Sequence, residues 1–113
     1  MSINWIPLTQ VEQIEEIKER SKLVPQMIYK HSTRCGTSSI VKRRLEKNQP
    51  PVFIEFYFLD LIKYRAISNK IADEFKVHHE SPQVLLIRNG ECVYEESHMG
   101  IRMEEMVNLV GNL

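Results

Sequence analysis

Apolar residues that recur every three or four positions mark four helices along the chain. The spacing predicts helices over about residues 9–21, 38–47, 64–75 and 102–110. Their inward positions are Val11, Ile14 and Ile17, then Ile40, Val41 and Leu45, then Ile67, Ile71 and Phe75, and last Met103, Met106, Val107 and Val110. Thr9 and Glu12 can cap the first helix, and Asn48 with the pair Pro50-Pro51 ends the second.

Short apolar runs between these helices predict four strands. The runs cover residues 26–30, 52–58, 83–88 and 91–95, and the last two are separated by Asn89-Gly90. Asn-Gly favours the two-residue turn of a β-hairpin, so the last two strands should be antiparallel. Strands that are joined through a helix should instead be parallel, with a right-handed crossover.

The predicted order of elements is α-β-α-β-α-β-β-α. A mixed four-stranded sheet with helices on both faces satisfies this order, which is the α/β plan of the thioredoxin-like fold. Phe53, Phe56 and Phe58 are assigned to the core, since their run is nearly continuously apolar, as in a strand covered on both faces. The chain has 113 residues, 42% of them hydrophobic, and no repeat or long linker, so we expect a single domain over residues 1–113.

Charge and composition exclude two classes of partner. Fifteen Lys and Arg balance fifteen Asp and Glu, so we expect no basic surface for nucleic acid or for an anionic membrane. No apolar run is long enough to span a bilayer, and the first residues lack the pattern of a signal peptide. Two cysteines make no disulfide scaffold. These features predict a cytoplasmic protein in a reducing compartment.

The candidate chemistry centres on Cys35, which lies between a predicted strand and a predicted helix. A helix N-terminus offers backbone N–H groups and the positive end of the helix dipole, and both stabilise a thiolate. The adjacent Arg34 can add to this effect. Ser38 stands where the second cysteine of a C-x-x-C motif would lie, so no disulfide closes within the motif. Ser38 either donates its hydroxyl to the thiolate or caps the helix.

The two cysteines and the four histidines also have interpretations without redox or metal chemistry. A buried structural thiol is the competing interpretation of Cys35, although its polar neighbours argue against it. Cys92, on the predicted edge strand, is interpreted as a thiol without a redox role. No metal site is expected, because tight ligand spacing is absent among His31, His78, His79 and His98. His31 either tunes Cys35 or is a surface loop residue.

The basic residues of the second helix, Lys42, Arg43 and Arg44, are most simply a solvated face. A secondary role in attracting carboxylate-bearing thiols stays open for them.

Three groups of residues match the pattern of a known family. They are residues 30–35 with Ser38; then Leu59-Asp60, Tyr64-Arg65, Ile67-Ser68 and Ile71-Ala72; and finally His79-Glu80-Ser81-Pro82-Gln83 with Asn89-Gly90, Ser97-His98 and Ile101. On these residues the chain resembles the YtxJ-like monothiol bacilliredoxins of the bacillithiol system, which have a thioredoxin-like fold. One departure is visible, because the family often has proline directly after the cysteine and this chain has Gly36.

The resemblance implies a redox-active cytoplasmic thiol–disulfide oxidoreductase. Such a protein removes bacillithiol, or a similar low-molecular-weight thiol, from the mixed disulfides of S-thiolated client proteins. It makes Cys35 the nucleophile and Ser81-Pro82 the substrate loop, with a cis bond before Pro82. The expected substrate-binding residues are Arg34, Gly36, Thr37, Ser38, Ser81 and Pro82. The low-molecular-weight thiol is a co-substrate, and no tightly bound cofactor is expected.

Two alternatives remain at this stage. One is a glutathione-using, glutaredoxin-like or peroxide-linked reductant, and the other is a non-enzymatic redox-sensing or binding module. The segment from Cys35 to Ser38 is also similar to the Cys-Gly-Phe-Ser of iron–sulfur-carrying glutaredoxins, but the glycine pair after their last hairpin is absent. The sequence identifies neither the carrier thiol, nor the clients, nor the oligomeric state.

Overall fold

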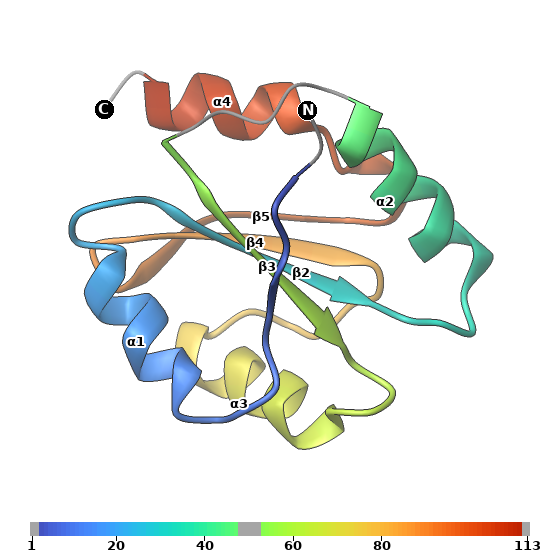
Figure 1. Ribbon diagram of the computed structural model, residues 1–113, viewed down its shortest axis with the longest axis horizontal. Coiled ribbons are helices and arrows are strands. Elements are labelled where there is room, and N and C mark those ends of the chain that lie inside the picture. The colour runs from blue at the N-terminus through green and yellow to red at the C-terminus, as the bar shows by residue number, and fades with distance from the viewer. Residues whose placement is uncertain (1–2, 48–52, 112–113) are drawn as a thin grey trace.

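In the computed structural model, which describes residues 3–47 and 53–111, a five-stranded sheet lies between two pairs of helices (Figure 1). The elements in chain order are β1 (Ile6–Pro7), α1 (Gln13–Arg20), β2 (Gln26–His31), α2 (Gly36–Lys47), β3 (Glu55–Asp60), α3 (Arg65–Phe75), β4 (Gln83–Arg88), β5 (Glu91–Ser97), the 3-10 helix η1 (His98–Gly100) and α4 (Met103–Gly111). The strand order is β1-β3-β2-β4-β5. The predicted mixed sheet with helices on both faces is confirmed, with one strand more than the four expected.

The additional strand is β1, which pairs in parallel with β3 through Ile6 opposite Tyr57. It has two residues, and the second is Pro7, so it leaves no periodic pattern in the sequence. The pairing continues one step beyond β1, where the Leu8 N–H donates to the Phe58 carbonyl at 2.9 Å. β1 therefore ties the N-terminal segment to the edge of β3.

Strand residues alternate between two hydrophobic clusters, one on each face of the sheet. Helices α2 and α4 cover one face, and α1 and α3 cover the other (Figure 1). In β2, Met27 and Tyr29 pack under α2 and α4, whereas Ile28 packs against α1 and α3. This period of two is the geometry of a pleated strand that is buried on both sides.

The hairpin between β4 and β5 forms as predicted. Asn89 and Gly90 have φ values of 54° and 79°, the positive values that a two-residue turn of this kind requires. Both N–H groups bond to Ser21, Asn89 to its carbonyl at 3.0 Å and Gly90 to its hydroxyl at 2.8 Å. The turn is therefore also fixed against the end of α1.

The predicted start of the first helix is wrong. Helix α1 begins at Gln13, and its N-cap residue Glu12 makes no side-chain capping bond. The Gln13 side chain instead accepts from the N–H groups of Thr9 and Gln10, at 2.8 and 2.9 Å. Val11 consequently lies before the helix and is 45% exposed rather than inward.

Two further residues predicted to be inward are largely exposed. Ile40 is 49% exposed, because Ser38, Val41 and Leu45 form the buried stripe of α2. Phe53 is 43% exposed, because β3 begins only at Glu55. The predicted helix stop at Asn48 and Pro50-Pro51, and the predicted strand start at Val52, lie outside the described residues.

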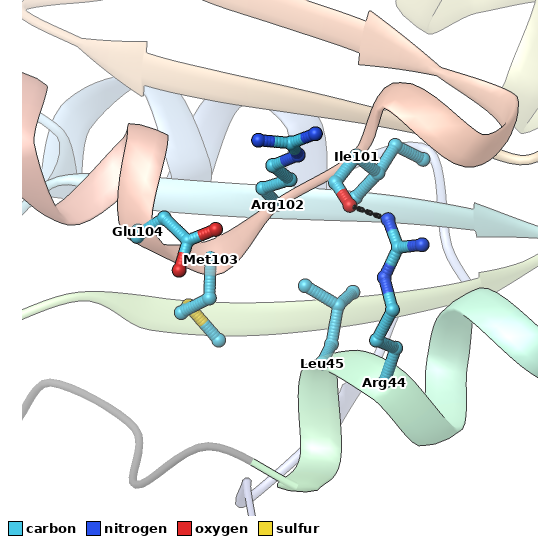
Figure 2. Close-up of a pocket in the computed structure, with 6 residues that line it drawn as sticks. All are labelled: Arg44, Leu45, Ile101, Arg102, Met103 and Glu104. Carbon is cyan, nitrogen blue, oxygen red and sulfur yellow. Dashed lines mark hydrogen bonds between the residues drawn. The ribbon is translucent and has the colours of Figure 1, made fainter.

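Arg44 of α2 holds the segment that precedes α4, as Figure 2 shows for Ile101. The Arg44 guanidinium donates to the Met99 carbonyl at 2.9 Å and also to the Ile101 carbonyl. A cavity of about 320 Å³ lies beside this contact and is lined by Arg44, Leu45, Ile101, Arg102, Met103 and Glu104. It adjoins the C-terminal half of α2, away from Cys35 at the other end. Within the described ranges, no helix is long and apolar enough to cross a membrane.

Candidate functional site

The loop between β2 and α2 places Cys35 directly before the first residue of α2. β2 lies between β3 and β4, so the loop leaves the sheet near its centre. Cys35 is partly exposed and is a free thiol. The sequence therefore located this residue correctly at the junction of a strand and a helix.

Hydrogen bonds centred on Ser32 and Ser38 shape this loop. The Cys35 N–H donates to the Ser32 carbonyl at 3.1 Å, and the Arg34 N–H donates to the Ser32 hydroxyl at 3.3 Å. The Ser32 N–H in turn donates to the buried Ser38 hydroxyl at 3.3 Å. Below them, the Tyr29 hydroxyl donates to the Ser38 carbonyl at 2.6 Å. The first turn of α2 is thus fixed against β2.

The surroundings of Cys35 lower the pKa of its thiol. The backbone N–H of Ser38 contributes most, and the backbone N–H of Thr37 and the hydroxyls of both residues add to it. Partial burial opposes them by raising the pKa. The exposed Arg34 guanidinium is not among these donors, although the sequence suggested it. The helix N-terminus, rather than a basic side chain, therefore favours the thiolate.

The Ser81-Pro82 loop lies next to the end of β2. The antiparallel register pairs Gln83 with Lys30, so the two residues before Gln83 come alongside the start of the Cys35 loop. The Ser81-Pro82 bond is cis, which confirms that prediction. The Pro82 carbonyl accepts from the His98 N–H at 2.9 Å, so η1 is held against the same loop.

The predicted substrate-binding residues differ in exposure. Arg34 and Gly36 are exposed, Thr37 and Ser81 are partly buried, and Ser38 and Pro82 are buried. A Cβ on Gly36 would meet no atom within 4 Å, so this position has room for a side chain. Four of these residues are near Cys35 along the chain, and the β2–β4 register places Ser81 and Pro82 beside the start of its loop. Their contact with a substrate stays a prediction.

Cys92 lies on β5 in a different environment. Its thiol is bonded to the Tyr94 carbonyl at 3.2 Å, and burial raises its pKa. It packs against the cluster under α1 and α3, whereas Cys35 precedes α2 on the opposite face of the sheet. This environment fits the interpretation of Cys92 as a thiol without a redox role.

Sequence reasoning missed a buried polar cluster behind the Ser81-Pro82 loop. Lys30 is fully buried, and its ammonium Nζ lies 3.3 Å from both the Ser68 carbonyl and His79 Nδ1. The Ser68 hydroxyl lies 3.3 Å from the same His79 nitrogen. Burial, and secondly the charge of Arg65, lowers the pKa of Lys30 to about 8. Burial also lowers the pKa of His79, and Lys30 adds to that effect.

His31 is also more deeply placed than the sequence suggested. It is the last residue of β2, is 7% exposed, and its ring centroid lies 5.1 Å from that of Phe58. The interpretation as a surface loop residue is therefore wrong. Burial lowers the pKa of His31, and the charge of Lys42 adds to the effect. Over the part of the chain described here, no group of three His, Cys, Asp or Glu side chains could hold a metal ion.

A free thiol directly before α2, beside the Ser81-Pro82 loop, is the arrangement expected of a thioredoxin-fold protein with one cysteine in its C-x-x-S motif. The model of the family described as monothiol bacilliredoxin BrxC matches residues 6–106. The chain belongs to this family, which confirms the resemblance identified from the sequence. Family and fold together support thiol oxidoreductase chemistry.

Solved structures agree with this assignment. A candidate oxidoreductase with a thioredoxin fold shares 28% identity at a TM-score of 0.77, over 91% of this chain and 90% of that one. Thioredoxin from Trypanosoma brucei brucei shares 15% identity at a TM-score of 0.72, over 98% and 95% of the two chains. Thioredoxin f from spinach chloroplast shares 12% at a TM-score of 0.71, over 98% and 94%. The last two show the fold alone.

Removing the Ser38 or Thr37 hydroxyl, which donate hydrogen bonds to Cys35, should shift the pKa of its thiol. Ser38→Ala and Thr37→Val should each raise the pKa of Cys35, because each removes a hydroxyl that stabilises the thiolate. The rate of alkylation by iodoacetamide from pH 4 to 10 measures this pKa. Ser39→Ala is the matched control, since it deletes an exposed hydroxyl of the same turn and should leave the pKa unchanged. An unchanged pKa in Ser38→Ala would mean that Ser38 only supports the helix.

The buried Lys30 predicts a distinctive dependence of stability on pH. Its folded pKa of about 8 lies below the ordinary value of 10.5, so the unfolded chain binds the proton more tightly. The free energy of unfolding should therefore rise from pH 8 to pH 10, towards a limit of about 3 kcal/mol from this group. Lys30→Met should be more stable than the parent at pH 7 and should lose that rise.

Urea unfolding at pH 7, 8, 9 and 10 measures the effect, as the difference between each variant and the parent. Lys70→Met, at an exposed lysine of α3, is the control and should keep the rise. If the parent and Lys30→Met show parallel pH curves, Lys30 does not titrate in this range.

Proposed function

We propose that this protein removes bacillithiol from mixed disulfides of client proteins, with Cys35 as the nucleophile. One observation carries the proposal: an accessible thiol precedes α2, where the N–H groups of Thr37 and Ser38 lower its pKa. The thiolate is the reactive form in thiol–disulfide exchange. Membership of the monothiol bacilliredoxin family supports bacillithiol as the thiol that is carried.

The reaction needs no tightly bound cofactor in this proposal. The Cys35 thiolate attacks the bacillithiol sulfur of a client mixed disulfide, and the bond to the client sulfur breaks. The client leaves as a thiolate, and a new disulfide joins Cys35 to bacillithiol. A second bacillithiol, as its thiolate, then attacks the bacillithiol sulfur of this adduct, and the bond to Cys35 breaks. The two bacillithiol molecules leave as their symmetrical disulfide, and Cys35 returns to the thiolate. Each step is a two-electron exchange that conserves one disulfide bond.

The second thiol has to come from outside the chain. Ser38 occupies the position of a resolving cysteine, and its hydroxyl accepts from the Ser32 N–H. Cys92 has a raised pKa and packs on the other face of the sheet. Neither residue is therefore suited to displace the adduct, so a diffusing thiol or a reductase completes the cycle.

The Ser81-Pro82 loop is proposed as the docking edge for the client. It adjoins the start of the Cys35 loop through the β2–β4 register, so an extended client segment can lie across both. In this proposal the backbone of Ser81 pairs with the client next to its modified cysteine. The setting is a reducing compartment, which we propose to be the cytoplasm.

A client transfer experiment tests the proposal. The reduced protein is mixed with a single-cysteine protein that carries a bacillithiol mixed disulfide, and both are followed by intact-mass spectrometry. We expect the client to lose bacillithiol and the chain to gain one adduct. Cys35→Ser should show neither change, because it lacks the nucleophile. Cys92→Ser is the matched control and should react like the parent.

The other outcomes separate the competing functions. Equal rates with bacillithiolated and glutathionylated clients would keep the exchange chemistry and reject bacillithiol specificity. A Cys35 adduct that forms from free bacillithiol disulfide, with no transfer from any client, would favour a redox sensor. Transfer that persists in Cys35→Ser would reject the nucleophile assignment.

A further inference from the structure

A cavity of about 400 Å³ opens beside the Cys35 loop, on the side of the molecule covered by α2. Its walls include Thr33 from the loop, Phe58 from β3, and Ser39, Lys42, Arg43 and Glu46 from α2. This volume is in the usual range for sites that bind small molecules. We refer to it below as the β3-side cavity.

The β3-side cavity lies within reach of a group attached to Cys35. Thr33 precedes Cys35 by two residues, and Ser39 follows it by four. Residues four apart on a helix are neighbours at roughly 6 Å, so the cavity begins about one helical turn from the thiol. A small molecule that is disulfide-bonded to Cys35 can therefore place its body there.

The cavity and the Ser81-Pro82 loop flank Cys35 on opposite sides. His31 and Phe58, which line the cavity, belong to β2 and β3. Pro82 directly precedes β4, and the strand order is β3-β2-β4. β2 and its loop therefore separate the cavity from the proposed docking edge for the client.

Charged and polar groups of the cavity suit a molecule that bears carboxylates. Arg43 is exposed at its rim and offers a guanidinium, which binds carboxylates through paired N–H donors. Thr33 and Ser39 add hydroxyls. Glu46 does not present an uncompensated negative charge, since it accepts from Lys42 at 2.8 Å and from the Trp5 ring N–H at 2.6 Å.

A buried, unpartnered group also lines the cavity. His31 is more than nine-tenths buried, and its Nδ1 has no hydrogen-bond partner among the residues that the structure describes. Burial lowers the pKa of His31 and so favours the neutral ring, in which one nitrogen donates a hydrogen bond and the other accepts one. The His31 ring therefore adds an uncharged polar side chain to the wall of the cavity beside the Cys35 loop.

A second hollow extends the β3-side cavity towards the N-terminal segment. It has about 250 Å³, is lined by Trp5 and Pro7, and shares Lys42 and Phe58 with the first. The Lys42 ammonium lies 5.6 Å from the centre of the Phe58 ring and 5.8 Å from that of Trp5. Together the two hollows run from a polar end near the Cys35 loop to an aromatic end at Trp5. They leave room for the body of a small molecule attached to its thiol.

We propose that the β3-side cavity is the subsite for the carrier thiol, and that it selects a low-molecular-weight thiol bearing carboxylates. This inference rests on the proposed function and names the site that the carried molecule occupies. Arg43 binds a carboxylate of the carrier, and the hydroxyls of Thr33 and Ser39 form hydrogen bonds to its polar body. The carrier sulfur is attacked by the Cys35 thiolate, its disulfide bond to the client breaks, and the client thiolate leaves on the Pro82 side.

Charge reversal at Arg43 tests the subsite. Second-order rate constants for reduced protein are measured by stopped flow with bacillithiol disulfide and with the uncharged hydroxyethyl disulfide. Arg43→Glu should lower the ratio of these two constants by about tenfold, because it removes a charge-assisted contact that only the carboxylate-bearing disulfide makes. Taking the ratio cancels any change in the reactivity of Cys35 itself.

Lys70→Glu is the matched control, because it makes the same charge change at an exposed position of α3 on the other face of the sheet. It should leave the ratio within about twofold of the parent, since general attraction between exposed charges is weak and screened by salt. Glutathione disulfide, which also bears carboxylates, should respond to Arg43→Glu in the same direction.

An unchanged ratio in Arg43→Glu, or an equal fall in both variants, would reject the subsite. Failure of the proposed function gives a different result, in which the parent protein reacts with none of these disulfides at Cys35. The two proposals can therefore fail separately.

Discussion

The hydrogen bond from the buried Tyr29 hydroxyl to the Ser38 carbonyl is the contact on which the site depends. Burial raises the pKa of Tyr29, so the hydroxyl stays protonated and keeps donating. Leaving such a buried donor unpaired costs about 1–3 kcal/mol, which resists any shift of the helix start. Because α2 is fixed there, the N–H groups of Thr37 and Ser38 stay directed at Cys35. The lowered pKa of the Cys35 thiol thus depends on a contact in the core rather than on a charged neighbour.

Alternate residues of β2 place chemically different side chains on the two faces of the sheet. Tyr29 and His31 face α2, where Tyr29 fixes the helix start and His31 lines the β3-side cavity. Lys30 faces the other side, where its ammonium contacts His79 close to the Ser81-Pro82 loop. Lys30 is fully buried and contacts no carboxylate among the described residues. Burying its charge without such a partner opposes folding at neutral pH. One central strand therefore connects the thiol, the cavity and the loop proposed to hold the client.

Local signals predicted most of the fold, and contacts between distant residues account for what was missed. Asn89-Gly90 specified the hairpin through its backbone preference, and the four-residue spacing of Ile67, Ile71 and Phe75 located α3. Cys35 was found because a strand and a helix meet there. Lys30 and His79 are 49 residues apart, so no local pattern connects them. The alternation of β2 did contain a usable signal, since it puts Lys30 on the same face as the buried Ile28.

The absence of a second thiol at position 38 changes what the rest of the site has to provide. Ser38 has a structural role at this position, because its hydroxyl accepts from the Ser32 N–H and its carbonyl accepts from the Tyr29 hydroxyl. A diffusing thiol must therefore reach the adduct on Cys35 without the carried molecule blocking its path. If the carrier body occupies the β3-side cavity, the side of Cys35 near Pro82 becomes open once the client has left. With the carrier and the client on opposite sides of β2, Cys35 alone could both take the carrier from the client and be released from it by a diffusing thiol.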